Sequence, residues 1–152
     1  MVGTGFIVAP ERIITNAHVI AGVTNPVVTG SNSNIQLAGR VTGIARQKDL
    51  ALIYVPWLSG ETLIFMGIVS LKGVGFIAGY PNGGSLRTTQ VSITSEPESI
   101  GKDIDNQGEV NRDVIVFSGK IMPGNSGGPL LNGKGQIIGM GFATDAQNEN
   151  TR

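Results

Sequence analysis

Three residues whose side chains could carry out acyl transfer stand far apart in the sequence. Ser126 lies in the glycine-rich segment PGNSGGPL at 123–130, where backbone N–H groups can converge and a substrate carbonyl can approach the hydroxyl. His18, the only histidine, lies in TNAHVI, and Asp49 begins DLALIYV. Taken singly, Ser126 could be a turn residue, His18 a buried core residue and Asp49 a turn cap.

The order of these residues along the chain favours the catalytic reading. Histidine, then aspartate, then serine is one of the recorded orders of the Ser/His/Asp triad. A single histidine cannot build a multi-histidine metal site, and the absence of cysteine excludes disulfides, thiolate zinc sites and a cysteine nucleophile. The sequence therefore predicts a triad that needs no metal or cofactor.

Composition limits the partners that this chain can have. The 152 residues contain 11 Lys and Arg against 11 Asp and Glu, so the chain lacks the basic excess that nucleic-acid binding requires. The longest apolar run, at 63–71, is far shorter than the roughly 20 residues needed to cross a bilayer. We expect protein or peptide partners, no nucleic acid, and a membrane association only through a segment outside this chain.

The elements that must position these residues are strands. Helical periodicity is nearly absent, and short β-branched or alternating runs are separated by Gly, Asn and Pro, which is typical of an all-β sandwich or barrel. Ten strands are predicted, near 4–8, 12–15, 27–29, 35–45, 50–55, 74–78, 86–94, 114–118, 129–131 and 136–141. They divide into an N-terminal half at 1–58, a linker at 59–72 and a C-terminal half at 73–152. Residues 17–21 are predicted to form a helical turn that stops at Gly22.

The segments TNAHVI, DLALI and GNSGGP together resemble the trypsin-like serine peptidases of the chymotrypsin fold. GYPNGG at 79–84 and RDV at 112–114 extend the similarity to the bacterial cell-envelope branch, which includes the HtrA proteases and membrane-anchored periplasmic proteases of mycobacteria. The resemblance implies two antiparallel six-stranded β-barrels with the active site in the cleft between them. Because members have a further strand at each end, we expect barrels truncated at both termini.

The resemblance also assigns roles. Ser126 would be the nucleophile, His18 the general base and Asp49 the residue that orients it, while the N–H groups of Gly124 and Ser126 would form the oxyanion hole. The position six residues before the nucleophile, which sets charge preference in the family, is Lys120. The wall of the specificity pocket would comprise Gly139, Met140, Gly141, Phe142, Ala143 and Thr144.

The function predicted on this basis is that of a serine endopeptidase that hydrolyses peptide bonds through an acyl-enzyme. The alternative is an inactive peptidase-like module that binds extended peptides in the cleft without cleaving them. The resemblance implies an extracytoplasmic location, in the periplasm or cell envelope, with a membrane anchor in the full-length protein.

Overall fold

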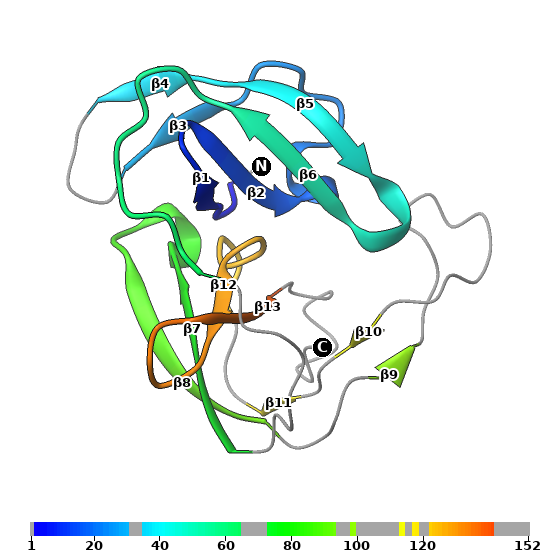
Figure 1. Ribbon diagram of the computed structural model, residues 1–152, viewed down its shortest axis with the longest axis vertical. Helices are drawn as coiled ribbons and strands as arrows, with labels where there is room; N and C mark the ends of the chain where they lie inside the picture. The colour runs from blue at the N-terminus through cyan, green and yellow to red at the C-terminus, as the bar shows by residue number, and fades with distance from the viewer. Residues whose placement is uncertain are drawn as a thin grey trace.

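The computed structural model describes residues 2–30, 35–64, 73–93 and 122–141, together with the strand segments 98–99, 113–114 and 117–118. These residues form an all-β protein with three short 3₁₀ turns, so the predicted class is confirmed. Its sheets lie in two groups, one above the other in Figure 1, which we call the first half (residues 2–58) and the second half (residues 73–141). None of the described residues belongs to a helix long and apolar enough to cross a membrane.

The first half is built on an antiparallel four-stranded sheet with the order β1-β2-β6-β5. Ile13 of β2 is directly paired with Ile53 of β6. Because paired residues lie on the same face of a sheet, both side chains are buried on the face that packs against the core. These two isoleucines form one core cluster with the buried residues Ala17, Ile20, Ala51 and Val55. The strands of this half are β1 (Phe6–Ala9), β2 (Arg12–Asn16), β3 (Val27–Thr29), β4 (Gln36–Ala38), β5 (Arg40–Ala45) and β6 (Leu50–Tyr54).

The turn after β2 places His18 at the end of the sheet. The 3₁₀ turn η1 (Ala17–Ile20) follows β2 directly, and its Ala17 and Ile20 side chains are buried in the first core. Gly22 then takes a φ of +77°, a left-handed conformation that glycine adopts at no steric cost. The predicted helical turn, stopped by Gly22, agrees with this geometry.

The prediction of a single continuous strand over 35–45 is wrong. The structure divides this segment at Gly39 into β4, which pairs with β3, and β5, which pairs with β6. The Gly39 N–H donates to the Pro26 carbonyl at 2.8 Å, and a Cβ at Gly39 would come within 2.8 Å of Ile53. The chain changes partner at Gly39 because only glycine allows so close an approach to the core.

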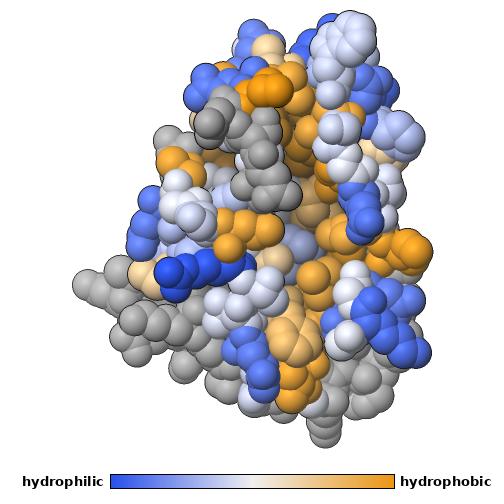
Figure 2. Space-filling model, turned by 90° about the vertical axis from the view of Figure 1, so that its left-hand side faces the viewer, coloured by the Kyte–Doolittle hydropathy of each residue, from blue (hydrophilic) through white to orange (hydrophobic). Residues whose placement is uncertain are grey.

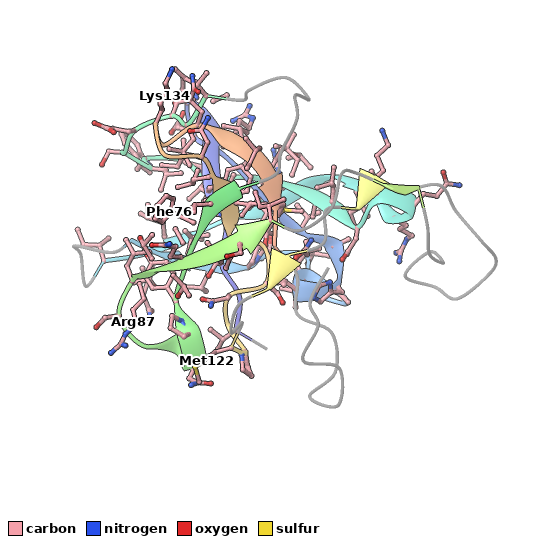
Figure 3. The ribbon with its side chains drawn as sticks, turned by 90° about the horizontal axis from the view of Figure 1, so that it is seen from below. Phe76, Arg87, Met122 and Lys134 are labelled. Carbon is pink, nitrogen blue, oxygen red and sulfur yellow. The ribbon has the colours of Figure 1, made fainter. Side chains whose placement is uncertain are left out.

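The second half contains a five-stranded antiparallel sheet with the order β11-β8-β7-β12-β13, and a separate pair formed by β9 and β10. Ile77, Val91, Ile93 and Leu130 form its core. Figure 3 shows Phe76 on β7 and Arg87 at the start of β8, with Lys134 in the turn between β12 and β13. The strands are β7 (Gly73–Gly79), β8 (Arg87–Ile93), β9 (Glu98–Ser99), β10 (Asp113–Val114), β11 (Phe117–Ser118), β12 (Pro129–Leu131) and β13 (Ile137–Met140), and the 3₁₀ turn η3 (Pro81–Gly83) lies between β7 and β8.

The strand arrangement departs from the sequence prediction in two further ways. The predicted strand at 114–118 corresponds to two strands, β10 and β11, which pair with β9 and β8 respectively; residues 115–116 lie outside the described residues. Six strands were expected in each barrel, whereas the largest sheets among the described residues have four and five strands. What the described residues show is therefore a β-sheet protein with two cores.

Backbone hydrogen bonds join the two halves through the segment that connects them. The Leu63 N–H donates to the Ile7 carbonyl at 3.0 Å, and the Ile137 N–H donates to the Ile64 carbonyl at 2.8 Å. The connecting segment therefore bonds to β1 of the first half and to β13 of the second. In Figure 2, hydrophobic side chains run down the middle of one face over both halves, between hydrophilic flanks.

Candidate active site

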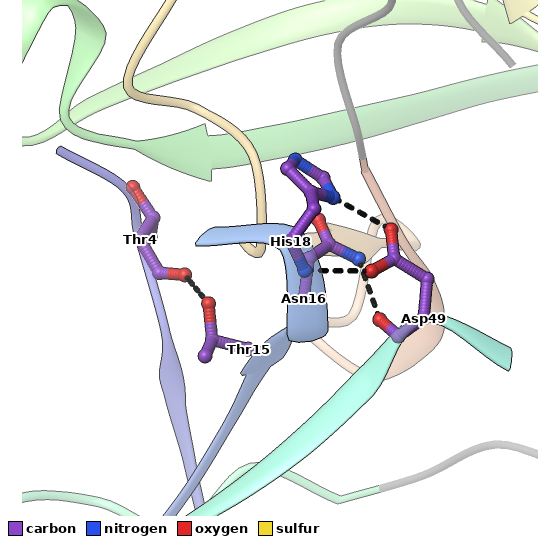
Figure 4. Close-up of polar contacts among 5 residues, drawn as sticks. All are labelled: Thr4, Thr15, Asn16, His18 and Asp49. Carbon is purple, nitrogen blue, oxygen red and sulfur yellow. Dashed lines mark hydrogen bonds and ion pairs between the residues drawn. The ribbon is translucent and has the colours of Figure 1, made fainter. Parts of the chain in front are cut away.

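His18 and Asp49 form a hydrogen-bonded pair at one end of the first half. The His18 Nδ1 lies 2.7 Å from Asp49 Oδ2, and the His18 backbone N–H donates to Asp49 Oδ1 at 2.9 Å (Figure 4). The Asp49 side chain is 5% exposed and the His18 side chain 33%. A carboxylate facing Nδ1 selects the tautomer with the proton on Nδ1, which leaves the Nε2 lone pair able to accept a proton.

The backbone of Asp49 is held as firmly as its side chain. Asp49 follows the 3₁₀ turn η2 (Arg46–Lys48) in a left-handed conformation, with φ 55° and ψ 43°. Its carbonyl accepts the Ala17 N–H at 3.0 Å and the Asn16 side-chain amide at 3.1 Å. The residues on either side of the β2–η1 junction are therefore bonded to the same aspartate, which fixes the position of the imidazole relative to the sheet.

The loop that carries Ser126 is a series of tight turns before β12. The Asn125 N–H donates to the Met122 carbonyl at 3.1 Å, and the Gly128 N–H donates to the Asn125 carbonyl at 3.0 Å. Gly127 and Gly141 complete the loop, because the Gly127 N–H donates to the Gly141 carbonyl at 2.9 Å. Ser126 itself is 8% exposed.

Gly127 brings this loop against the strand that leads to His18. Its φ is +91°, and a Cβ there would collide with the Thr4 carbonyl and the Thr15 hydroxyl and would lie 3.2 Å from the Asn16 backbone nitrogen. The residue after Ser126 therefore packs on β2 two residues before His18. Close approach of the two backbones requires glycine at this position.

Two peptide groups of the loop are oriented by hydrogen bonds to their carbonyls. The Pro123 carbonyl accepts the Asn82 N–H at 2.5 Å and the Asn125 carbonyl accepts the Gly128 N–H at 3.0 Å. Because the carbonyl and N–H of a trans peptide point in opposite directions, the N–H groups of Gly124 and Ser126 face away from Asn82 and Gly128. Gly124, with a φ of +97°, packs so closely on the Tyr80 carbonyl that no Cβ would fit.

Three of the predicted pocket residues lie within the described part of the chain. Gly139 and Met140 are half-buried on β13, and the buried Gly141 bonds to the Ser126 loop through both its N–H and its carbonyl. The other predicted pocket residues, Lys120, Phe142, Ala143 and Thr144, lie outside the described residues.

Sequence reasoning missed three buried polar residues around the site, Thr4, Thr15 and Asn16, which are 5%, 3% and 1% exposed. The Thr15 hydroxyl donates to the Thr4 carbonyl at 2.6 Å, and the Asn16 amide bonds to Asp49, as Figure 4 shows. A signal for Thr4 was present in the sequence, because it stands between two glycines in GTGF. Thr15 and Asn16 belong to the motif TNAHVI, but nothing in that pattern indicates that their side chains bond to Thr4 and Asp49.

A model of the family described as "Trypsin-like peptidase domain" matches residues 3–140. The chain therefore belongs to the trypsin-like peptidase family. The resemblance inferred from the three motifs is confirmed by this match.

Within that family the chain is similar to serine protease Rv3671c of Mycobacterium tuberculosis, with 34% identity over 142 residues that cover 92% of this chain and 35% of the relative. The crystal structure of the active form of Rv3671c protease has a TM-score of 0.89 and 32% identity, covering 98% of this chain and 66% of that one.

The chain is also similar to two other proteins. The putative serine protease HhoB of Synechocystis is 36% identical over 155 residues, covering 95% of this chain and 35% of the relative. The HtrA-type protease AlgW, solved with a decapeptide, has a TM-score of 0.78 and 25% identity, covering 99% of this chain and 46% of that one. The chain spans about a third of the length of the curated relatives named here.

Proposed function

We propose that this chain is the catalytic domain of a serine endopeptidase, with Ser126 as the nucleophile, His18 as the general base and Asp49 as the residue that orients it. The observation that carries the proposal is the bonding of His18 to a buried aspartate through both its ring and its backbone N–H, beside a strand on which the Ser126 loop packs. Membership of the trypsin-like family, whose relatives are named serine proteases, supports it.

In the proposed reaction, the Ser126 hydroxyl attacks the carbonyl carbon of a peptide bond while His18 Nε2 accepts its proton. The oxygen of the tetrahedral intermediate would be stabilised by the N–H groups of Gly124 and Ser126, whose peptide carbonyls are held away from it. His18 then returns the proton to the leaving amine, and water hydrolyses the acyl-enzyme by the same route. Asp49 stabilises the imidazolium that forms in both steps.

The finer architecture belongs to the same proposal. Residues 1–58 and 73–152 would each belong to one of the two six-stranded barrels of the chymotrypsin fold, joined by a linker at 59–72, with the active site between the barrels. Lys120 would lie at the base of the specificity pocket, and residues 139–144 would line its wall. The substrates would be extended segments of proteins or peptides, bound in an extracytoplasmic compartment.

The test is labelling by a fluorophosphonate probe, which reacts only with a serine activated by its base and oxyanion hole. We expect mass spectrometry to find the probe on Ser126 of the wild-type protein and no labelling of Ser126→Ala. Casein hydrolysis by Ser126→Ala should fall by several orders of magnitude, roughly the 10⁶-fold of triad knockouts. An unlabelled wild type that still binds peptides in a folded state would favour the peptide-binding module instead.

A further inference from the structure

Thr4 makes four hydrogen bonds although it precedes the first strand of the chain. Its N–H donates to the Ser126 carbonyl at 2.8 Å, and its hydroxyl donates to the Gly124 carbonyl at 2.7 Å. The hydroxyl also accepts the Tyr80 N–H at 3.1 Å, and the Thr4 carbonyl accepts the Thr15 hydroxyl at 2.6 Å. With a relative exposure of 5%, Thr4 makes these bonds away from bulk water.

The two carbonyls that Thr4 holds stand on either side of one peptide group. The Gly124 carbonyl belongs to the peptide before Asn125–Ser126 and the Ser126 carbonyl to the peptide after it. The Asn125–Ser126 peptide between them carries an N–H that is one of the two proposed oxyanion donors. With its neighbours bonded on both sides to the same threonine, this peptide has little freedom to rotate. A group that must stabilise charge in a transition state needs this kind of fixed orientation.

Thr4 also links this loop to the general base. The Thr15 hydroxyl that donates to Thr4 belongs to β2, three residues before His18 on the same stretch of chain. The Thr4 hydroxyl accepts the N–H of Tyr80, and two residues later the Asn82 N–H donates to the Pro123 carbonyl of the loop. One residue therefore bonds to the strand of the base, the loop of the nucleophile and the segment that supports that loop.

The hydroxyl is the part of Thr4 that no apolar side chain can replace. It is one donor with acceptor lone pairs, and here it both donates and accepts. In Thr4→Val a methyl group would take its place, and carbon approaches a carbonyl oxygen only to about 3.3 Å. The Gly124 carbonyl and the Tyr80 N–H would then both lose their buried partner, and the carbonyl would have to move.

We propose that Thr4 is a positioning residue of the active site, whose hydroxyl and N–H hold the Gly124–Ser126 backbone in the orientation that stabilises the oxyanion. The proposal rests on the proposed function, because it assigns to Thr4 a role in that reaction. It acts through the loop, because its hydroxyl and N–H donate to backbone carbonyls of the loop.

The experiment compares Thr4→Val with wild type in fluorophosphonate labelling of Ser126 and in hydrolysis of fluorescein-labelled casein. We expect the labelling rate and kcat to fall about 10- to 100-fold in Thr4→Val, as small displacements of catalytic groups do, with KM within about twofold. Thr4→Ser retains the hydroxyl and should restore both to within about threefold. Ile53→Val, a core change in the first half, controls for lost stability and should leave both rates unchanged.

Four outcomes would overturn the proposal. A folded Thr4→Val that is labelled as fast as wild type would show that the hydroxyl does not position the loop. If Thr4→Val and Ile53→Val have the same unfolding midpoint and Thr4→Val loses no more activity than Ile53→Val, then Thr4 contributes to stability alone. If Thr4→Val does not fold, the smaller Thr4→Ala is tested in its place. If both variants are unfolded while Thr4→Ser is fully active, the hydroxyl is needed for stability, and the positioning role is overturned. A wild type that the probe does not label would overturn the proposed function as well.

Discussion

At the scale of single residues, Asp49 shows how one side chain and its own backbone can serve the same site. Its carboxylate accepts from both the ring and the backbone N–H of His18, while its carbonyl accepts from Ala17 and Asn16. These bonds run from one residue, directly before β6, to the three consecutive residues 16–18. The imidazole is thereby held in one orientation before any substrate binds, which is what general-base catalysis needs.

Asp49→Asn should lower kcat about 10⁴-fold while leaving the fold intact, as the corresponding aspartate-to-asparagine change does in a Ser/His/Asp peptidase. Asparagine tolerates the left-handed conformation found at this position, so the backbone should not change. Its amide would donate to Nδ1, and the proton would then sit on Nε2, where it prevents His18 from accepting the serine proton. Steady-state hydrolysis of casein, with circular dichroism as the folding check, measures this effect.

Glu61→Gln is the matched control, since it makes the same change of acid to amide at an exposed position. We expect its kcat to equal that of the wild type. An Asp49→Asn protein that kept a tenth of wild-type activity would remove Asp49 from the mechanism.

At the scale of elements, the Ser126 loop is positioned by glycines that let it lie against other backbone. Gly124 packs on the Tyr80 carbonyl and Gly127 on the Thr4 carbonyl, and both have positive φ angles. Glycine has two separable advantages at such a position: it adopts the left-handed conformation, and it leaves room for a neighbour. The chain offers a comparison that separates them.

Gly127→Ala and Gly135→Ala both place a Cβ on a residue with positive φ, of +91° and +77°, but only Gly127 has neighbours within 4 Å. Gly135→Ala should therefore cost about 1–2 kcal/mol for the backbone conformation alone. Gly127→Ala should lose a further 1–3 kcal/mol, roughly the cost of overpacking, because the Cβ would displace the Thr4 carbonyl or the Thr15 hydroxyl. Urea unfolding of the two variants and the wild type provides the numbers, and equal losses would contradict the packing argument.

At the scale of the whole molecule, the two cores are separate but hydrogen bonds link the two halves at more than one place. Thr4, at the start of the first half, bonds to Gly124, Ser126 and Tyr80 in the second. The connecting segment bonds to β1 through Leu63 and to β13 through Ile64. Opening one half therefore breaks hydrogen bonds that also hold the other half.

Ile53→Ala in the first core and Ile77→Ala in the second should each destabilise the whole molecule by about 2–5 kcal/mol. Because the halves share the bonds described above, each variant should raise amide hydrogen exchange in peptides from both halves. Val74→Ala, at a position 52% exposed, is the control and should change exchange little. Faster exchange confined to the half that carries the substitution would mean that the halves unfold independently.

The sequence by itself determined the class of fold, the family and the chemistry that the site could carry. Strand positions followed from alternation and from glycine-rich turns, and the motifs around His18, Asp49 and Ser126 identified the family because these residue types are needed at the reacting atoms. The strand boundary at Gly39 was missed, since local propensity in 35–45 favours one continuous strand and only pairing with β3 and β6 divides it.

The tertiary structure alone decided which other residues support the site. Thr4, Thr15 and Asn16 have ordinary strand or turn residue types, and their importance comes from partners that are distant in the sequence, such as Gly124, which lies 120 positions after Thr4. Long-range contacts of this kind depend on how two sheets are placed relative to each other, which no local pattern encodes. The role of the threonine between two glycines in GTGF emerges only in the folded chain, where its hydroxyl donates to the Gly124 carbonyl and its N–H donates to the Ser126 carbonyl.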